Sequence, residues 1–121
     1  MLKSALCAIS FAFATELFAM LVAPAQAAAP GYVGTWGVDA NQCQKAQDAP
    51  GAPIVFTANG YDQHEAHCTF TSIAPSANGW KINANCTVEG TMQTDAFTLE
   101  TDDDELIITR GESMLRLKRC T

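Results

Sequence analysis

The chain has 121 residues and a formal net charge of −6, and 48% of its residues are hydrophobic while 17% are charged. This length bounds the protein to one domain and excludes folds such as the (β/α)8 barrel, which need about 200 residues or more. The basic residues are not clustered, so the composition argues against nucleic acid and anionic membrane surfaces as partners.

Residues 1–27 have the pattern of a secretory signal peptide. Lys3 supplies a positive start, residues 5–23 are almost wholly apolar, and residues 25–27 (Ala-Gln-Ala) form a small-x-small cleavage site. We therefore expect export to the periplasm or the medium, cleavage after Ala27, and a single mature β domain over residues 28–121.

A retained membrane-spanning helix is the alternative for this segment. Glu16 lies in the middle of the apolar run, where an acidic residue costs about 3 kcal/mol in a bilayer, and Pro24 follows it. Cys7 precedes the run, so it cannot carry a lipid after cleavage. The sequence thus predicts neither stable membrane insertion nor a lipid anchor.

The mature chain has a cysteine content typical of a small exported domain. Loss of Lys3 and Glu16 leaves 12 acidic and 6 basic residues, so the net charge stays at −6. A core of this size is marginal by itself, and an even number of cysteines in such a domain indicates disulfides. Two bridges are expected among Cys43, Cys68, Cys86 and Cys120.

The mature chain alternates short β-type runs with turn residues, which predicts an all-β antiparallel meander. Closure into a small barrel is the preferred architecture, and a sandwich is the second. Segment 39–52 is expected to be a loop with one helical turn, capped by Asp39 or Asn41, and Asn59-Gly60 is expected to be a type I′ turn. The expected strands are 33–38, 53–58, 63–73, 79–88, 92–100, 105–110 and 113–119.

Residue alternation fixes the register expected for the central hairpin. Pairing Cys68 with Cys86 centres the hairpin on Ala77, within the Pro-Ser-Ala-Asn-Gly turn, and separates an apolar from a polar face. This favours a Cys68–Cys86 bridge and leaves Cys43 for Cys120. The residues expected to share the apolar face are Cys68, Phe70 and Ser72 with Cys86, Ala84, Ile82 and Trp80.

A second hairpin is expected around the acidic turn that follows it. Phe97 and Leu99 should face Ile108 and Leu106 across a turn over residues 101–104. Leu115 and Leu117 add a further apolar pair.

Few residues are candidates for catalysis or metal binding, and we assign no catalytic, cofactor-binding or metal-binding residue. His64 and His67 have opposite parity in a strand, so they leave opposite faces and do not make a zinc site. Residues 102–105 are acidic but lack the spacing of a calcium loop, so we expect a solvated hairpin tip rather than a calcium site. No nucleophile motif surrounds the serines of the mature chain, which are Ser72, Ser76 and Ser113.

Residues 34–36 (Gly-Thr-Trp) resemble the opening motif of the lipocalin and wider calycin barrels. In those barrels the tryptophan closes one end beneath a basic residue from a late strand, a structural role that the resemblance gives here to Trp36 with Arg116 or Arg119. Simple core packing is the alternative role for Trp36. The pattern of GTWG, four cysteines and a final Arg-Cys also resembles short bacterial exported proteins of unknown function.

These observations predict a small exported protein that is not an enzyme and acts by binding. Small calycin-like barrels include exported protease inhibitors, so inhibition of another exported protein, such as a hydrolase, is the first hypothesis. The alternative is a carrier of a small apolar ligand, which would need an apolar cavity of at least about 300 Å³. The sequence does not indicate an oligomeric state.

Overall fold

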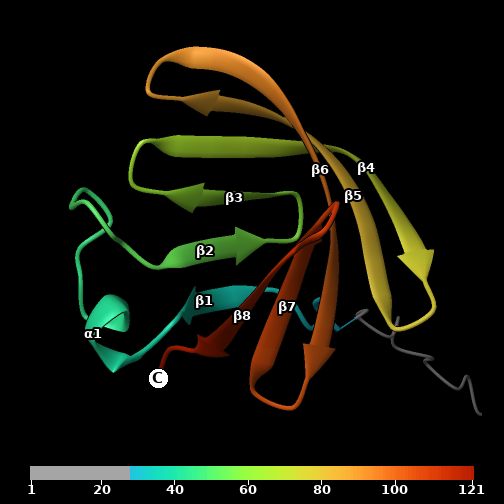
Figure 1. Cartoon of the computed structure of the whole chain (residues 1–121), viewed down its shortest axis with the longest axis horizontal. Helices are drawn as coiled ribbons and strands as arrows, with labels where there is room; N and C mark the ends of the chain where they lie inside the picture. Colours follow the sequence, from blue (N-terminus) through green and yellow to red (C-terminus); the bar gives the residue numbers. More distant parts are fainter. Residues whose placement is uncertain (1–27) are drawn as a thin grey trace, which may run out of the picture.

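A computed structural model describes residues 28–121; the expected signal segment 1–27, with Cys7, lies outside the described residues. Within residues 28–121, antiparallel strands follow one another in chain order around a closed barrel, β1 to β8 (Figure 1). No helix in this range is long and apolar enough to cross a membrane. The elements are β1 Gly34–Gly37, α1 Ala40–Cys43, β2 Ile54–Thr57, β3 Gly60–Gln63, β4 Ala66–Ser76, β5 Gly79–Val88, β6 Thr91–Asp102, β7 Glu105–Arg110 and β8 Ser113–Arg119.

The predicted all-β barrel is confirmed, with one strand more than expected. The sequence predicted a single strand over 63–73, but the chain forms β3, turns at His64 and Glu65, and starts β4 at Ala66. His64 has φ +42° in this turn. The helical turn expected within 39–52 is α1, and Asp39 caps it by accepting a hydrogen bond from the Gln42 amide at 2.9 Å.

The prediction of a type I′ turn at Asn59-Gly60 is wrong. The two-residue connection is Ala58-Asn59, because Thr57 pairs with Gly60, and neither Asn59 nor Gly60 has a positive φ. Gly60 is needed inside β3 for another reason: a Cβ there would run into the carbonyl oxygen of Cys68 on β4. Glycine therefore serves close strand contact at this position rather than turn geometry.

The central hairpin β4–β5 has the predicted register in its first half only. Cys68 pairs with Cys86 and Phe70 with Ala84, as expected. A bulge at Thr71 then shifts the pairing by one residue, and Ile73 rather than Ser72 comes to the level of Ile82. The bulge moves the hydroxyl of Ser72 to the outer face, where the Asn83 amide donates a hydrogen bond to it at 2.8 Å.

Both predicted disulfides are present. Cys68–Cys86 joins β4 to β5, with Cα atoms 4.0 Å apart. Cys43–Cys120 ties α1 to the end of β8, across 77 residues of sequence, with Cα atoms 5.4 Å apart. Two disulfides in a domain of this size indicate folding in an oxidising, non-cytoplasmic compartment.

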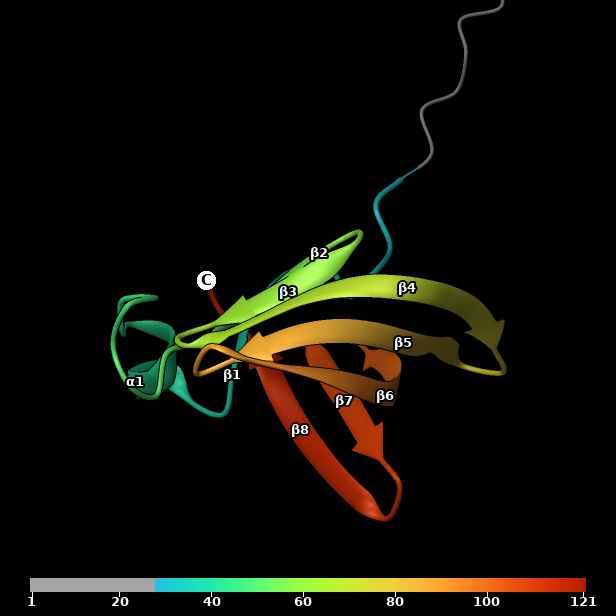
Figure 2. The same cartoon turned by 90° about the horizontal axis from the view of Figure 1, so that it is seen from above.

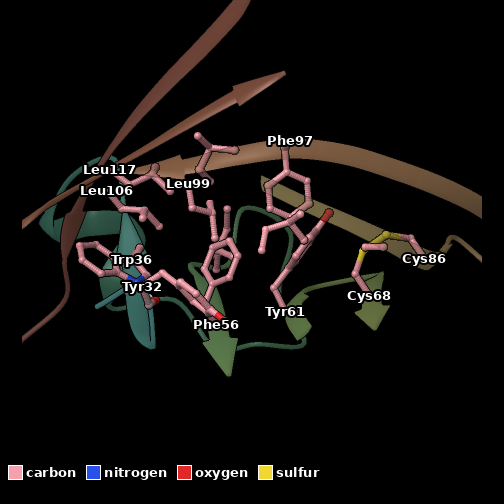
Figure 3. Packing of buried hydrophobic residues seen from close by; sticks show 14 residues of the cluster. Tyr32, Trp36, Phe56, Tyr61, Cys68, Cys86, Phe97, Leu99, Leu106 and Leu117 are labelled. Atoms are coloured by element: carbon pink, nitrogen blue, oxygen red, sulfur yellow. Dashed lines mark hydrogen bonds between the residues drawn. A yellow bond between two sulfur atoms is a disulfide. The ribbon is translucent and has the colours of Figure 1, made fainter. Parts of the chain in front are cut away.

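The core fills the inside of the barrel with apolar and aromatic side chains (Figure 3). Tyr32, just before β1, contacts Phe56, Phe70 and Trp80 in edge-to-face geometry, with centroids 4.9 to 6.1 Å apart. On β6 and β7, Leu99 pairs with Ile108, and the register is two residues from the predicted one although the buried faces are as expected. Other buried members of the core are Trp36, Ile54, Tyr61, Ile82, Phe97, Leu106 and Leu117.

Candidate functional site

Trp36 and Arg119 close one end of the barrel. The Trp36 side chain is fully buried, and its indole nitrogen donates a hydrogen bond to the Tyr32 carbonyl at 2.8 Å. The Arg119 guanidinium lies 4.2 Å from the centre of the indole ring and donates to the carbonyls of Val33 and Gly31, each at 3.1 Å. This arrangement holds the chain that enters the barrel against its last strand.

Of the two arginines considered from sequence, Arg119 therefore occupies this position. Arg116 lies on the outside of β8 and pairs with Glu105 of β7, with nitrogen and oxygen 3.4 Å apart. The geometry also explains the glycine of the motif, since Gly34 has φ +147° and a Cβ there would collide with Arg119. The Gly-x-Trp motif thus has a structural role in fixing Trp36 and Arg119.

A second charged cluster, which the sequence did not reveal, joins β3, β6 and β7. Asp95 accepts two-pronged hydrogen bonds from Arg110 at 2.9 to 3.2 Å and a further one from the Tyr61 hydroxyl at 3.1 Å. Arg110 also lies 4.9 Å from the centre of the Phe97 ring. Its guanidinium spans the gap that opens where β6 runs past β7.

This environment raises the pKa of Tyr61 and that of Arg110. Burial raises the pKa of Tyr61, and the negative charge of Asp95 raises it further. Burial alone would lower the pKa of Arg110, but its hydrogen bonds to Asp95 and that carboxylate's charge outweigh burial and raise it. All three groups are held in mutually satisfied contacts, so the cluster closes the barrel wall rather than offering a free acid or base.

The histidines considered from sequence lie at separate places. His64 is in the β3–β4 turn instead of on a strand, with its Nε2 3.9 Å from a Glu65 oxygen. His67 is on the outer face of β4, and its Nδ1 is 2.7 Å from an Asp62 oxygen. Within residues 28–121, no three potential ligands converge as a metal ion would require.

The turn predicted over residues 101–104 is shorter than expected: Asp102 still pairs with Glu105, and Asp103 and Asp104 alone connect β6 to β7. Asp103 has φ +54° at the tip, and Glu105 pairs with Arg116 of β8, with oxygen and nitrogen 3.4 Å apart. The Asp104 carbonyl accepts a hydrogen bond from the Arg119 amide at 2.9 Å. This tip therefore supports the end of β8 through the Asp104 carbonyl.

Strand β8 has an edge that no described segment covers. β1 is short and pairs with β8 only at Trp36–Arg119 and Gly37–Lys118. Residues 113–117 of β8 consequently have β7 on one side and no strand of residues 28–121 on the other. Figure 2 shows β8 and the β7–β8 turn extending away from β1. Met114 is 61% exposed on this strand, and Leu115 is 40% exposed although it pairs with buried Ile108.

A groove on the outer face of β3, β4 and β5 has a volume of about 500 Å³. Its floor is the backbone around Gly60 and Cys68, and its walls are polar side chains. These include Asn59, Asp62, His67, Thr69, Asn85 and Thr87, with Met92 at one side.

Comparison with protein-family models, with curated proteins and with solved structures finds no match. Any assignment of function therefore rests on the residues and contacts described above.

Proposed function

We propose that this protein is an exported binding protein, periplasmic or secreted, that holds another exported protein by accepting an extended segment along the free edge of β8. The observation that carries the proposal is the stretch 113–117, which has unpaired backbone groups on one side and two exposed apolar side chains. A partner segment that adds as a strand would pair this backbone and cover Met114 and Leu115.

The other two strand overhangs are protected in ways that β8 is not. β4 runs beyond β3, but its overhang contains the bulge at Thr71 and ends near Pro75, and both features hinder further strand pairing. β6 runs beyond β7, and the Arg110–Asp95 ion pair crosses the gap there. The β8 overhang contains no proline, and its pairing with β7 is regular.

The charge of the protein favours a basic partner. The 12 acidic and 6 basic residues that follow the expected cleavage site give a net charge of −6, and two of the arginines are already paired with Asp95 and Glu105. Electrostatic attraction between the acidic protein and a basic partner speeds their association, and this effect weakens as salt screens the charges. Among exported proteins, a hydrolase is the partner we favour, on the analogy with small calycin-like inhibitors; binding would then inhibit it.

The carrier alternative is less well supported. Within residues 28–121 the inside of the barrel is occupied by Trp36, Tyr32, Phe56, Phe97 and the leucines of β6 to β8, packed ring against ring (Figure 3). A carrier needs an apolar cavity of about 300 Å³ or more at this place.

Two methionine variants test the proposal. Met114 and Met92 are both exposed, at 61% and 71%, but only Met114 lies on the β8 overhang, so Met114→Lys and Met92→Lys make the same chemical change. The immobilised mature protein is used to capture partners from the native exported fraction, and each captured hydrolase is assayed with and without it. We expect Met114→Lys to lose capture and inhibition, Met92→Lys to keep both, and added salt to slow association.

Equal capture by the two variants would show that β8 is not the binding edge. The same conclusion would follow if the bound partner protected backbone amides of this protein from hydrogen exchange outside residues 113–117. Unfolding curves of both variants ensure that the comparison is between folded proteins.

A further inference from the structure

The groove on β3, β4 and β5 is built where β3 contributes only backbone, at Gly60. Gly60 faces Thr69 across the strand pair, and the contact with the Cys68 carbonyl leaves no space for a side chain at position 60. The side chains around this gap, Asn59, Thr69 and Asn85, therefore rim a hollow instead of a flat sheet surface.

The rim presents hydrogen-bonding groups of both kinds. The amides of Asn59 and Asn85 each offer two donor hydrogens and an acceptor oxygen, and the Thr69 hydroxyl donates and accepts. Asp62 holds His67 with one oxygen, which leaves its second oxygen as an acceptor and the far ring nitrogen of His67 toward solvent. Asn83, the next asparagine on the same face of β5, is outside the groove and its amide is engaged by Ser72.

We propose that this groove binds a neutral saccharide or a related polyol. Neighbouring hydroxyls of a sugar act at once as donors and acceptors, and paired amide, carboxylate and hydroxyl groups match that pattern. Met92 lies at one side of the groove and supplies a flexible apolar surface for the C–H face of the ring. The site is separate from the β8 edge and does not depend on the function proposed for it.

The charges of the groove select against ionic ligands. No lysine or arginine is among the residues that line it, so an anion finds no cationic partner there. Its one carboxylate, Asp62, is 2.7 Å from His67, which reduces its attraction for an organic cation. A neutral ligand needs only hydrogen bonds and a volume of about 500 Å³, which holds one or two sugar rings.

Titration of the mature protein with four neutral sugars (glucose, galactose, N-acetylglucosamine and maltose), and separately with cationic glucosamine, followed by amide chemical shifts, tests the proposal. At least one of the four neutral sugars should shift resonances of β3, β4 and β5 around Gly60, Thr69 and Asn85 and saturate, with a dissociation constant on the order of 1 mM. Asn85→Ala should weaken binding about 3- to 10-fold, the loss expected for one hydrogen-bonding group, and Asn83→Ala should leave it unchanged.

Three results would overturn the proposal. One is the absence of saturable shifts with all four sugars. The second is equal weakening by Asn85→Ala and Asn83→Ala, which would place the sugar outside the groove. The third is a response to cationic glucosamine alone, which would mean that Asp62 attracts charge and that the polyol pattern is irrelevant. Asn83 and Asn85 are both exposed, so neither replacement should unfold the barrel. The amide spectrum of each variant checks that it is folded.

Discussion

Replacing Arg119 by Ala should destabilise the protein far more than replacing Arg116, three residues earlier on the same strand. Arg119 stacks on Trp36 at 4.2 Å and donates to two backbone carbonyls at 3.1 Å, one of them part-buried. A cation–π contact contributes about 1 kcal/mol in such a setting, and hydrogen bonds from a charged donor contribute about 1 to 2 kcal/mol each when partly shielded. The expected loss in the free energy of unfolding is therefore about 3 kcal/mol.

Arg116 provides the matched control. Among residues 28–121 its one ionic contact is with Glu105, at 3.4 Å, and both side chains are exposed, at 56% and 36%. A pair of this kind contributes between 0 and about 1 kcal/mol because water and salt screen it. Arg119→Lys should fall between the two alanine variants, since lysine keeps the charge but loses the planar fork that reaches both carbonyls.

Urea unfolding of the oxidised proteins, followed by tryptophan fluorescence, measures these differences. For a domain of this size, 3 kcal/mol corresponds to a fall of roughly 12 to 24 °C in the melting temperature. Losses of equal size for Arg119→Ala and Arg116→Ala would refute the assignment of Arg119 as the residue that closes the barrel over Trp36.

Three further predictions concern pH, the disulfides and export. Burial raises the pKa of Tyr61 and Tyr32 above 10.0, so the folded protein keeps both protons longer than the unfolded chain and its stability should fall as pH rises beyond about 10. Tyr61→Phe should flatten this fall in unfolding curves at pH 8 to 11, and an unchanged slope would contradict it. Removing Cys43–Cys120, which spans 77 residues of sequence, should cost about 4.5 kcal/mol and removing Cys68–Cys86, which spans 18, about 3 kcal/mol in denaturant titrations of the double-alanine variants. The reverse order would argue against the chain-entropy account. Mass spectrometry of the native exported protein should find Ala28 at its amino terminus, and a retained Met1 would disprove cleavage after Ala27.

The parts of the fold that the sequence predicted are those in which two local patterns agree. Around Cys68 and Cys86, turn residues and alternation of apolar side chains specify the same pairing, and the disulfide and the first half of the hairpin follow it. No distinctive residue marks the bulge at Thr71 in the sequence. The bulge is held by hydrogen bonds with Asn83 of β5, whose carbonyl accepts from the Thr71 hydroxyl and whose amide donates to the Ser72 hydroxyl. A local pattern carries no information about such a contact.

The charged cluster of Asp95, Arg110 and Tyr61 escaped prediction because its members are 15 and 34 residues apart. A pattern that could have found it is present in the strands themselves. Asp95 has the same parity as buried Phe97 and Leu99, and Arg110 has the parity of Ile108. Opposite charges at inward positions of adjacent strands should pair, since an isolated one would be too costly to bury.

The candidate binding edge follows from unequal strand lengths. β8 has 7 residues and β1 has 4, so the barrel closes through two residue pairs and the rest of β8 overhangs. β1 cannot extend further along it, because the chain turns away after Gly37 into the capped helical turn that Cys43–Cys120 fastens to the end of β8. The disulfide thus holds the seam shut at one end, while residues 113–117 have β7 on one side and no strand of residues 28–121 on the other. A barrel filled by aromatic side chains has little space for a ligand inside, which is why our proposal places recognition on a surface of this kind on its wall.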